Sequence, residues 1–288
     1  MSFSQDVKEE LARHLSPARH CQLAELAAML HFCGQYGRDK EGRYTIGFQT
    51  ENEAVSRKGF TLLKKTYNIN TDAEIDQEQM DDIFSGIGDL ESPVSSVLIK
   101  SSCCQRAFLR GAFLSVGSIS DPVKGYHLEF VCTSAEKAAQ LQDVLQAFNI
   151  EGKLVLRKKY FVVYLKEGES IVDLLNICEA HIALMEFENL RILKDVRNSV
   201  NRRVNCEAAN ITKTVNAATR QIEDIEYIRD HGGLGQLPDN LCQMAEVRLE
   251  YPDAPLKELG EYLDPPVGKS GVNHRLRKLS EFAEKLRT

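Results

Sequence analysis

The chain contains 288 residues, of which 43% are hydrophobic and 27% charged, and its formal net charge is −6 at pH 7. This length is enough for two or three domains with a sizeable core, and the composition is typical of a folded globular protein. The net negative charge excludes a protein that coats nucleic acid with its whole surface, but it is compatible with a basic module on an acidic body.

The sequence lacks the signals of a membrane or secreted protein. No run approaches the roughly 20 apolar residues of a membrane-spanning helix, so we expect no membrane partner. The first ten residues carry charges where a secretory signal needs an apolar stretch, which predicts a cytoplasmic protein with reduced, mostly buried cysteines. Cys178 and His181 have the spacing of metal ligands, but no second pair completes a tetrahedral zinc site. We therefore expect neither a metal nor another cofactor.

Helix-like and strand-like segments alternate from residue 11 to about residue 191. The first part predicts two helices, at residues 22–32 and 52–67, and two strands, at residues 43–50 and 94–100. A similar series then recurs, with helices at 103–115, 135–148 and 170–178 and strands at 126–133, 153–158 and 160–166. We predict an internal duplication of a mixed α/β unit with antiparallel hairpins, in which the repeats cover about residues 19–100 and 103–190.

Every charged residue between positions 71 and 91 is acidic: Asp72, Glu74, Asp76, Glu78, Asp81, Asp82, Asp89 and Glu91. This pattern is typical of a solvated surface. It also fits a face of the body that repels DNA by like charge.

The charge changes sign past residue 190. Asp195 and Glu207 are outnumbered there by basic residues, namely Arg191, Lys194, Arg197, Arg202, Arg203, Lys213 and Arg220. We predict a basic helical connector over residues 191–234. It should end in a glycine-rich hinge at residues 231–235. A helix from a capping Asp239 to Arg248 should then open a C-terminal domain at 235–288.

The end of the chain has the pattern of a helix-turn-helix. An apolar-periodic segment at 254–263 is followed by Asp264-Pro265-Pro266 and by a second periodic segment at 267–279. In the second helix, one face should pack on the first helix, through Val272, Leu276 and Leu279 against Leu256, Leu259 and Leu263. The opposite face would then reach the major groove of DNA, where Arg pairs with guanine and Asn with adenine. The structural alternative is a helical hairpin with a solvated basic face.

We therefore expect double-stranded DNA as the partner. The predicted DNA-binding residues are Lys269, Ser270, Asn273, His274, Arg275, Arg277 and Lys278 of the second helix, with Arg202 and Arg203 of the connector. Ser270 and the free amides of the first helical turn could hold a phosphate.

Two further segments, residues 26–34 and 109–117, share a small and apolar helical pattern that ends in glycine. Ala27, Ala28, Gly111 and Ala112 would allow two helices to pack closely. The segments resemble the paired helices of the LAGLIDADG homing endonucleases. That resemblance implies a saddle-shaped duplication of an αββαββα unit, with a metal-binding acidic residue just before each final glycine.

The positions that match those acidic residues hold Cys33 and Val116. Neither supplies the hard oxygen ligand that Mg²⁺ prefers, and the nearby Asp39 and Asp121 lie beyond the glycines. We therefore expect no catalytic residues and no enzyme activity.

The whole chain resembles the WhiA family of bacterial regulators. The resemblance rests on residues 1–4 and 7–11, 108–114, 201–210 and 263–278. It implies an α+β fold, in which a degenerate LAGLIDADG-like domain joins a C-terminal all-α helix-turn-helix domain. It also implies a nucleoid-associated transcriptional regulator linked to sporulation, cell division and chromosome segregation. Two other functions stay open: a metal-dependent endonuclease, and a protein-interaction module that binds partners through the N-terminal domain.

Overall fold

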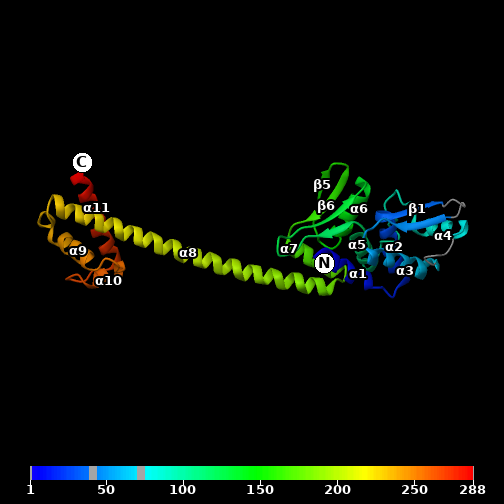
Figure 1. The fold of residues 1–288 in the computed structure, drawn as a ribbon, viewed down its shortest axis with the longest axis horizontal. Coiled ribbons are helices and arrows are strands. Elements are labelled where there is room, and N and C mark those ends of the chain that lie inside the picture. Colours follow the sequence, from blue (N-terminus) through cyan, green and yellow to red (C-terminus); the bar gives the residue numbers. More distant parts are fainter. Residues whose placement is uncertain (1, 39–43, 70–74, 288) are drawn as a thin grey trace. The chain divides into compact units, whose positions relative to one another are not determined.

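The computed structural model describes residues 2–38, 44–69 and 75–287 (Figure 1). The chain forms two compact units, Met1–Asp195 and Val196–Thr288. Each unit has its own hydrophobic core. Among the residues described, no helix combines the length and apolar character needed to cross a membrane.

The second repeat of unit 1 has the complete αββαββα order. Its elements are α5 (Ser102–Val116), β3 (Gly117–Ile119), β4 (Leu128–Cys132), α6 (Ala135–Gln146), β5 (Lys153–Arg157), β6 (Tyr160–Leu165) and α7 (Gly168–Ile177). The strands form one antiparallel sheet in the order β3-β4-β6-β5. Leu128, Phe130 and Cys132 alternate along β4 and are fully buried, because α5 and α6 pack on that face of the sheet. The fold class predicted from the sequence is confirmed.

The first repeat is shorter. Preceded by α1 (Phe3–Arg13), it contains α2 (Arg19–Cys33), β1 (Gly34–Arg38), β2 (Tyr44–Phe48), α3 (Glu53–Tyr67) and α4 (Gln77–Ile87). Within its described part, β1 and β2 make a two-stranded antiparallel sheet, and α4 with the turns that follow takes the place of a second hairpin. Of the acidic segment, Asp72 and Glu74 lie outside the described residues, whereas Asp76 caps α4 through a hydrogen bond from Gln79 N.

The strand predicted at residues 94–100 is wrong, since this segment forms turns. Val94 is buried, but the Gln140 side chain makes hydrogen bonds with both of its backbone groups. Val94 N donates to Gln140 Oε1 at 2.9 Å, and Gln140 Nε2 donates to Val94 O at 2.6 Å. Val97 is 79% exposed, so the apolar run does not enter a sheet. A side chain from α6 thus satisfies backbone groups that a neighbouring strand would otherwise pair.

Helices α2 and α5 pack closely against each other at the centre of unit 1. A Cβ atom at Gly111 would lie 2.5 Å from the carbonyl oxygen of Glu25, so this contact requires glycine. Ala27, Ala28 and Ala112 are fully buried beside it. The close packing predicted from the small residues is confirmed.

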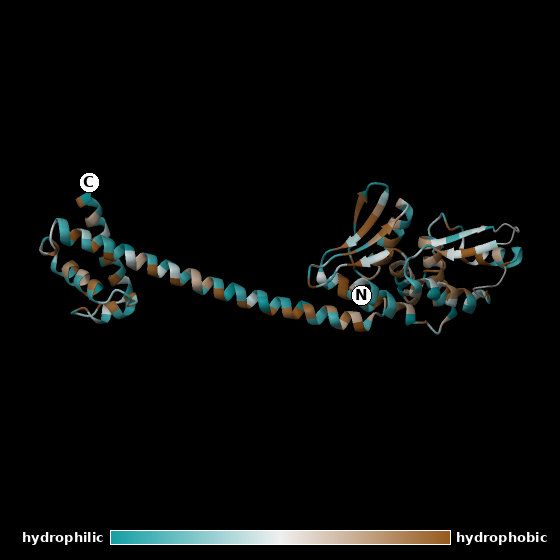
Figure 2. Cartoon of the chain, viewed as in Figure 1, coloured by the Kyte–Doolittle hydropathy of each residue, from teal (hydrophilic) through white to brown (hydrophobic). Residues whose placement is uncertain are grey.

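The longest helix, α8 (His181–His231), contains the basic stretch predicted as a connector. Its first turns reach the core of unit 1 through Ala183 and Phe187, and its last turns reach the core of unit 2 through Ile225 and Ile228. Hydrophilic and hydrophobic bands alternate along its length in Figure 2. Its exposed apolar residues include Val200.

Unit 2 completes its core with a 3₁₀ turn η1 (Leu234–Gln236) and the helices α9 (Asp239–Glu250), α10 (Leu256–Glu261) and α11 (Lys269–Arg287). Gly233 precedes η1 with a φ of 75°, a left-handed conformation that favours glycine. The expectation that the Asp239 side chain caps α9 is wrong. Asp239 is the first helical residue, and no side-chain hydrogen bond comes from Pro238 at the cap position. Asp239 instead places a negative charge in the first turn, where it complements the helix dipole.

Candidate DNA-binding surface

The turn between α10 and α11 is held by a backbone hydrogen bond and by close packing. Val267 N donates to the carbonyl oxygen of Gly260 at 2.9 Å. A Cβ atom at Gly260 would lie 2.0 Å from the Val267 oxygen, and one at Gly271 would lie 2.2 Å from Val267 Cγ1. The two glycines therefore let the chain turn tightly and set the position of α11 against α10.

The apolar side of α11 packs as the sequence predicts. Val272, Leu276 and Leu279 are buried in one cluster with Leu259 and Leu263, and the half-buried Leu256 packs against it. This anchoring fixes the rotation of α11 about its own axis. The helix therefore presents a defined opposite face to solvent.

Six of the seven residues predicted on α11 lie on its exposed side: Lys269, Ser270, Asn273, His274, Arg277 and Lys278. Arg277 is 70% exposed and forms an ion pair with Glu281 at 3.3 Å, one turn further along α11. An exposed pair of this kind contributes only about 0.2–1 kcal/mol, so DNA can compete for the guanidinium.

Arg275 differs from the other six. It is half-buried, and its guanidinium donates to the backbone oxygen of Asn240 in the first turn of α9 at 3.5 Å. The structure thus places Arg275 where it links α11 to α9. Sequence periodicity could not identify this contact, because it depends on how α9 packs.

Helix α8 contributes a row of basic side chains to unit 2. Arg202 and Lys213 are 11 residues apart, which places them on the same side of the helix about 16 Å apart along its axis. Arg220 continues the row and pairs with Glu284 of α11 at 3.5 Å. Arg203 is also exposed and pairs with Glu207 at 3.2 Å.

Lys213 of this row lines a hollow in unit 2 that extends to the first turns of α11. It is lined by Lys213, Thr214, Ala217, Ala218, Gln221, Arg248, Ala254, Pro255, Leu256 and Asn273. Lys213 and the predicted base-reading residue Asn273 therefore share one concave surface. Periodicity along the chain could not predict this juxtaposition, because 60 positions separate the two residues.

Arg248 forms part of the wall of that hollow. The side chain is buried, and it donates to the Ala254 oxygen at 2.8 Å, which ties the end of α9 to the segment before α10. Burial lowers the pKa of Arg248, and the Asp253 carboxylate opposes the shift. Arginine stays protonated in proteins, so the wall of the hollow carries a positive charge.

The positions that match the endonuclease metal ligands lie at the ends of α2 and α5 in unit 1. Cys33 is buried and burial raises the pKa of its thiol, whereas Val116 is half-buried. Asp39 lies outside the described residues. Asp121 is exposed, and its carboxylate accepts a hydrogen bond from Val123 N at 2.8 Å. Neither helix thus ends in a carboxylate that could hold a metal for hydrolysis.

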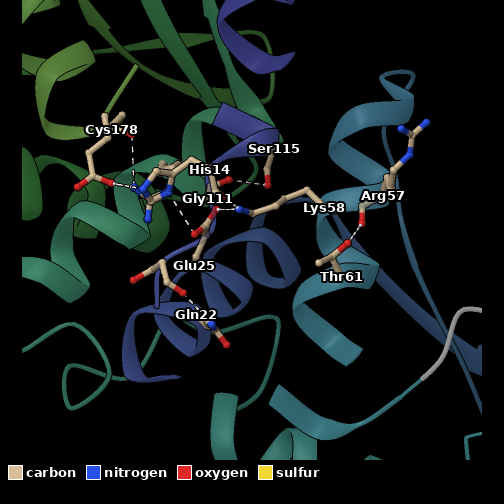
Figure 3. Close-up of polar contacts among 12 residues, drawn as sticks. His14, Gln22, Glu25, Arg57, Lys58, Thr61, Gly111, Ser115 and Cys178 are labelled. Atoms are coloured by element: carbon tan, nitrogen blue, oxygen red, sulfur yellow. Dashed lines mark hydrogen bonds and ion pairs between the residues drawn. The ribbon is translucent and has the colours of Figure 1, made fainter. Parts of the chain in front are cut away.

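A buried network of charges, which the sequence did not predict, lies beside the paired helices (Figure 3). Glu25 of α2 is fully buried and forms ion pairs with Lys58 Nζ at 3.0 Å and with Arg110 Nε at 3.2 Å. Arg110 also pairs with Glu179 at 2.7 Å, and His14 contacts the same carboxylate at 2.7 Å. Burial lowers the pKa of Lys58, while Glu25 opposes this shift. The network joins α2, α3 and α5. The sequence alone does not distinguish its buried members from the exposed charged residues of the same helices, such as Arg57.

Three comparisons place these features among known proteins. Family models match residues 19–82 (WhiA N-terminal LAGLIDADG-like domain), 105–197 (WhiA LAGLIDADG-like domain) and 200–283 (WhiA C-terminal HTH domain). The protein named "Probable cell division protein WhiA" in Lachnoclostridium phytofermentans is 50% identical over 312 residues, which covers 100% of both chains. The protein of the same name in Alkaliphilus oremlandii is 50% identical and covers 99% of this chain and 98% of the relative. The crystal structure of full-length DUF199/WhiA from Thermatoga maritima matches 99% of both chains with a TM-score of 0.59 and 28% identity.

Proposed function

Because the chain belongs to the WhiA family, we propose that it is a transcriptional regulator that binds double-stranded DNA in a sequence-specific manner through α11. The observation that carries the proposal is the polar face of α11, which stands opposite an apolar face anchored on α10. A helix held in this way can enter the major groove with a fixed set of side chains toward the bases.

We assign different tasks to the two groups of polar residues. Asn273 and Arg277 would read base edges, since amide and guanidinium groups can each make two hydrogen bonds to one base. Arg202, Arg203 and Lys213 would contact phosphates, which adds affinity for any sequence and sets the orientation of the protein. The hollow shared by Lys213 and Asn273 supports a single continuous surface for both tasks.

Substitution of Arg277 tests the assignment to base reading. On duplexes taken from a map of chromosomal occupancy of the native protein, we expect Arg277→Ala to lower affinity by about 1–3 kcal/mol at the preferred site. Its affinity for a scrambled duplex should fall much less, so that specificity decreases. Fluorescence anisotropy at fixed salt measures both values.

Arg13→Ala is the matched control, because Arg13 is 78% exposed and forms a comparable ion pair with Glu9 at 3.4 Å. The control should leave both affinities unchanged. Equal losses on the specific and scrambled duplexes for Arg277→Ala would contradict base reading by α11.

We further propose that this regulator acts in cell division, with the associated sporulation and chromosome segregation, from the nucleoid in the cytoplasm. Two relatives are named probable cell division proteins, which supports the cellular role. The occupancy map should show discrete sites upstream of division genes. A uniform distribution over the chromosome would argue against a specific regulator.

We propose that the protein has no nuclease activity, since Cys33 and Val116 stand where the endonuclease ligands would be. Plasmid DNA should stay supercoiled with Mg²⁺ or Mn²⁺. Metal-dependent nicking that Asp121→Asn abolishes would contradict this.

Unit 1 is then free for protein partners, and the exposed acidic residues Glu78, Asp81 and Asp82 of α4 would suit a basic one. A full-length Asp81→Asn/Asp82→Asn variant should keep its DNA affinity and lose cross-links to that partner in cells. Tighter DNA binding by the variant would instead support a face that repels DNA.

A further inference from the structure

A cluster of four metal-binding side chains lies where α2 and α5 begin. His20 and Cys21 belong to the first turn of α2, and Cys103 and Cys104 belong to the first turn of α5. One ligand atom of each residue lies within 4.8 Å of the other three. His20 Nδ1 is 3.1 Å from Cys104 Sγ and 3.4 Å from Cys21 Sγ. Segments about 80 residues apart in the sequence thus supply two ligands each.

These distances are close to those of a tetrahedral zinc site. With Zn–S bonds of about 2.3 Å and Zn–N bonds of about 2.0–2.1 Å, tetrahedral geometry separates nitrogen from sulfur by about 3.5 Å and sulfur from sulfur by about 3.8 Å. The two nitrogen–sulfur distances of 3.1 and 3.4 Å lie just below that value. Three sulfurs and an imidazole, with no carboxylate among them, favour zinc over magnesium or calcium.

The surroundings of the cluster also fit a structural metal. Cys21 and Cys104 are each only 5% exposed and pack with Ala24 and Ala107, which are fully buried. His20 and Cys103 are exposed, which gives an ion a route from solvent.

We propose that His20, Cys21, Cys103 and Cys104 bind one Zn²⁺ ion and thereby clamp α2 to α5. The site lies at the opposite end of these helices from Cys33 and Val116, so it is separate from the endonuclease metal position. Four protein ligands leave no coordination position for water, so the ion stabilises the fold and does no chemistry. The site does not depend on the proposed DNA-binding function.

Metal analysis of the full-length protein tests the proposal. Protein purified without chelator from cells supplied with zinc should contain a single zinc ion per chain. Replacement by Co²⁺ should give the intense visible absorption of a tetrahedral cobalt–thiolate centre. Zinc removal should lower the melting temperature, and added zinc should restore it.

Two variants and one control locate the ion. His20→Gln and Cys103→Ser change exposed ligands, so circular dichroism should show folded proteins, and both should lose the stoichiometric zinc. The control, Cys206→Ser, changes an exposed cysteine of α8 and should keep the stoichiometric zinc.

Three results would overturn the proposal. The first is wild-type protein that takes up neither zinc nor cobalt. The second is a cobalt spectrum that Cys103→Ser leaves unchanged. The third is a disulfide between two of the three cysteines that prevents metal-free protein from binding the ion. If both variants unfold, the wild-type cobalt spectrum still decides whether a thiolate site is present.

Discussion

Glu25 is a buried charged side chain at the contact between α2 and α5, where it meets Arg110. It is fully buried, and its partners Lys58 and Arg110 are almost fully buried as well. Charges withdrawn from water in this way are tolerated only as a matched set, because each one alone would carry a large desolvation cost. Lys58 also donates to the backbone oxygen of His14, which extends the network to the end of α1.

Removal of the Glu25 charge should therefore be costly. We expect Glu25→Gln to lower the free energy of unfolding of unit 1 by about 3–5 kcal/mol, because Lys58 and Arg110 would stay buried without their counter-charge. Urea denaturation followed by circular dichroism measures the change. The control is Glu53→Gln, which breaks an exposed ion pair with Arg57 and should cost less than about 1 kcal/mol. Similar losses in the two variants would show that the network contributes little.

At the scale of elements, the turn between α10 and α11 depends on close packing at Gly260 and Gly271. We expect Gly260→Ala to destabilise unit 2 by about 1–3 kcal/mol, since the added methyl group would press on the Val267 backbone rather than on a flexible side chain. DNA affinity should fall with it because α11 loses its anchoring. Thermal unfolding of the full-length protein, read alongside DNA titration, gives both quantities.

Gly268→Ala is the control in the same turn, because a Cβ atom there would have no neighbour within 4 Å. It should leave the melting temperature nearly unchanged. A tolerated Gly260→Ala would mean that the turn adapts without moving α11.

The elements that the sequence predicted well include those with long apolar runs. The helix at 103–115 and the strand at 160–166 correspond to α5 and β6, in which residues 107–114 and Val162, Val163 and Leu165 are buried. The apolar run at 94–100 failed because pairing depends on a neighbouring strand, and α6 supplies Gln140 instead. Likewise, the polar face of α11 followed from periodicity. The contact of Arg275 with α9 and the cluster around His20 required the tertiary packing.

At the scale of the whole molecule, positive charge collects on residues 191–220 of α8 and on α11 of an acidic protein. Arg202→Ala combined with Arg203→Ala should weaken binding to all duplexes alike. It should also reduce the slope of log affinity against log salt concentration by about 2, because two phosphate contacts are lost. Anisotropy titrations over a range of KCl concentrations measure the slope. A double control, Arg13→Ala with Arg57→Ala, removes two exposed arginines of unit 1 and should leave it unchanged. An unaltered slope in the connector variant would assign the phosphate contacts to other residues.

The burial of the Glu25 network has a practical consequence for such titrations. Dissolved ions screen exposed charges over about 10 Å at 0.1 M salt, but they act far more weakly on pairs enclosed by protein. The Glu25 carboxylate, the Lys58 ammonium and the Arg110 guanidinium are enclosed in this way, so added KCl changes the energy of their pairs little. Ionic strength can therefore be raised until DNA is released while unit 1 stays folded, and a salt-dependent loss of affinity reports counterion exchange at the DNA surface rather than denaturation.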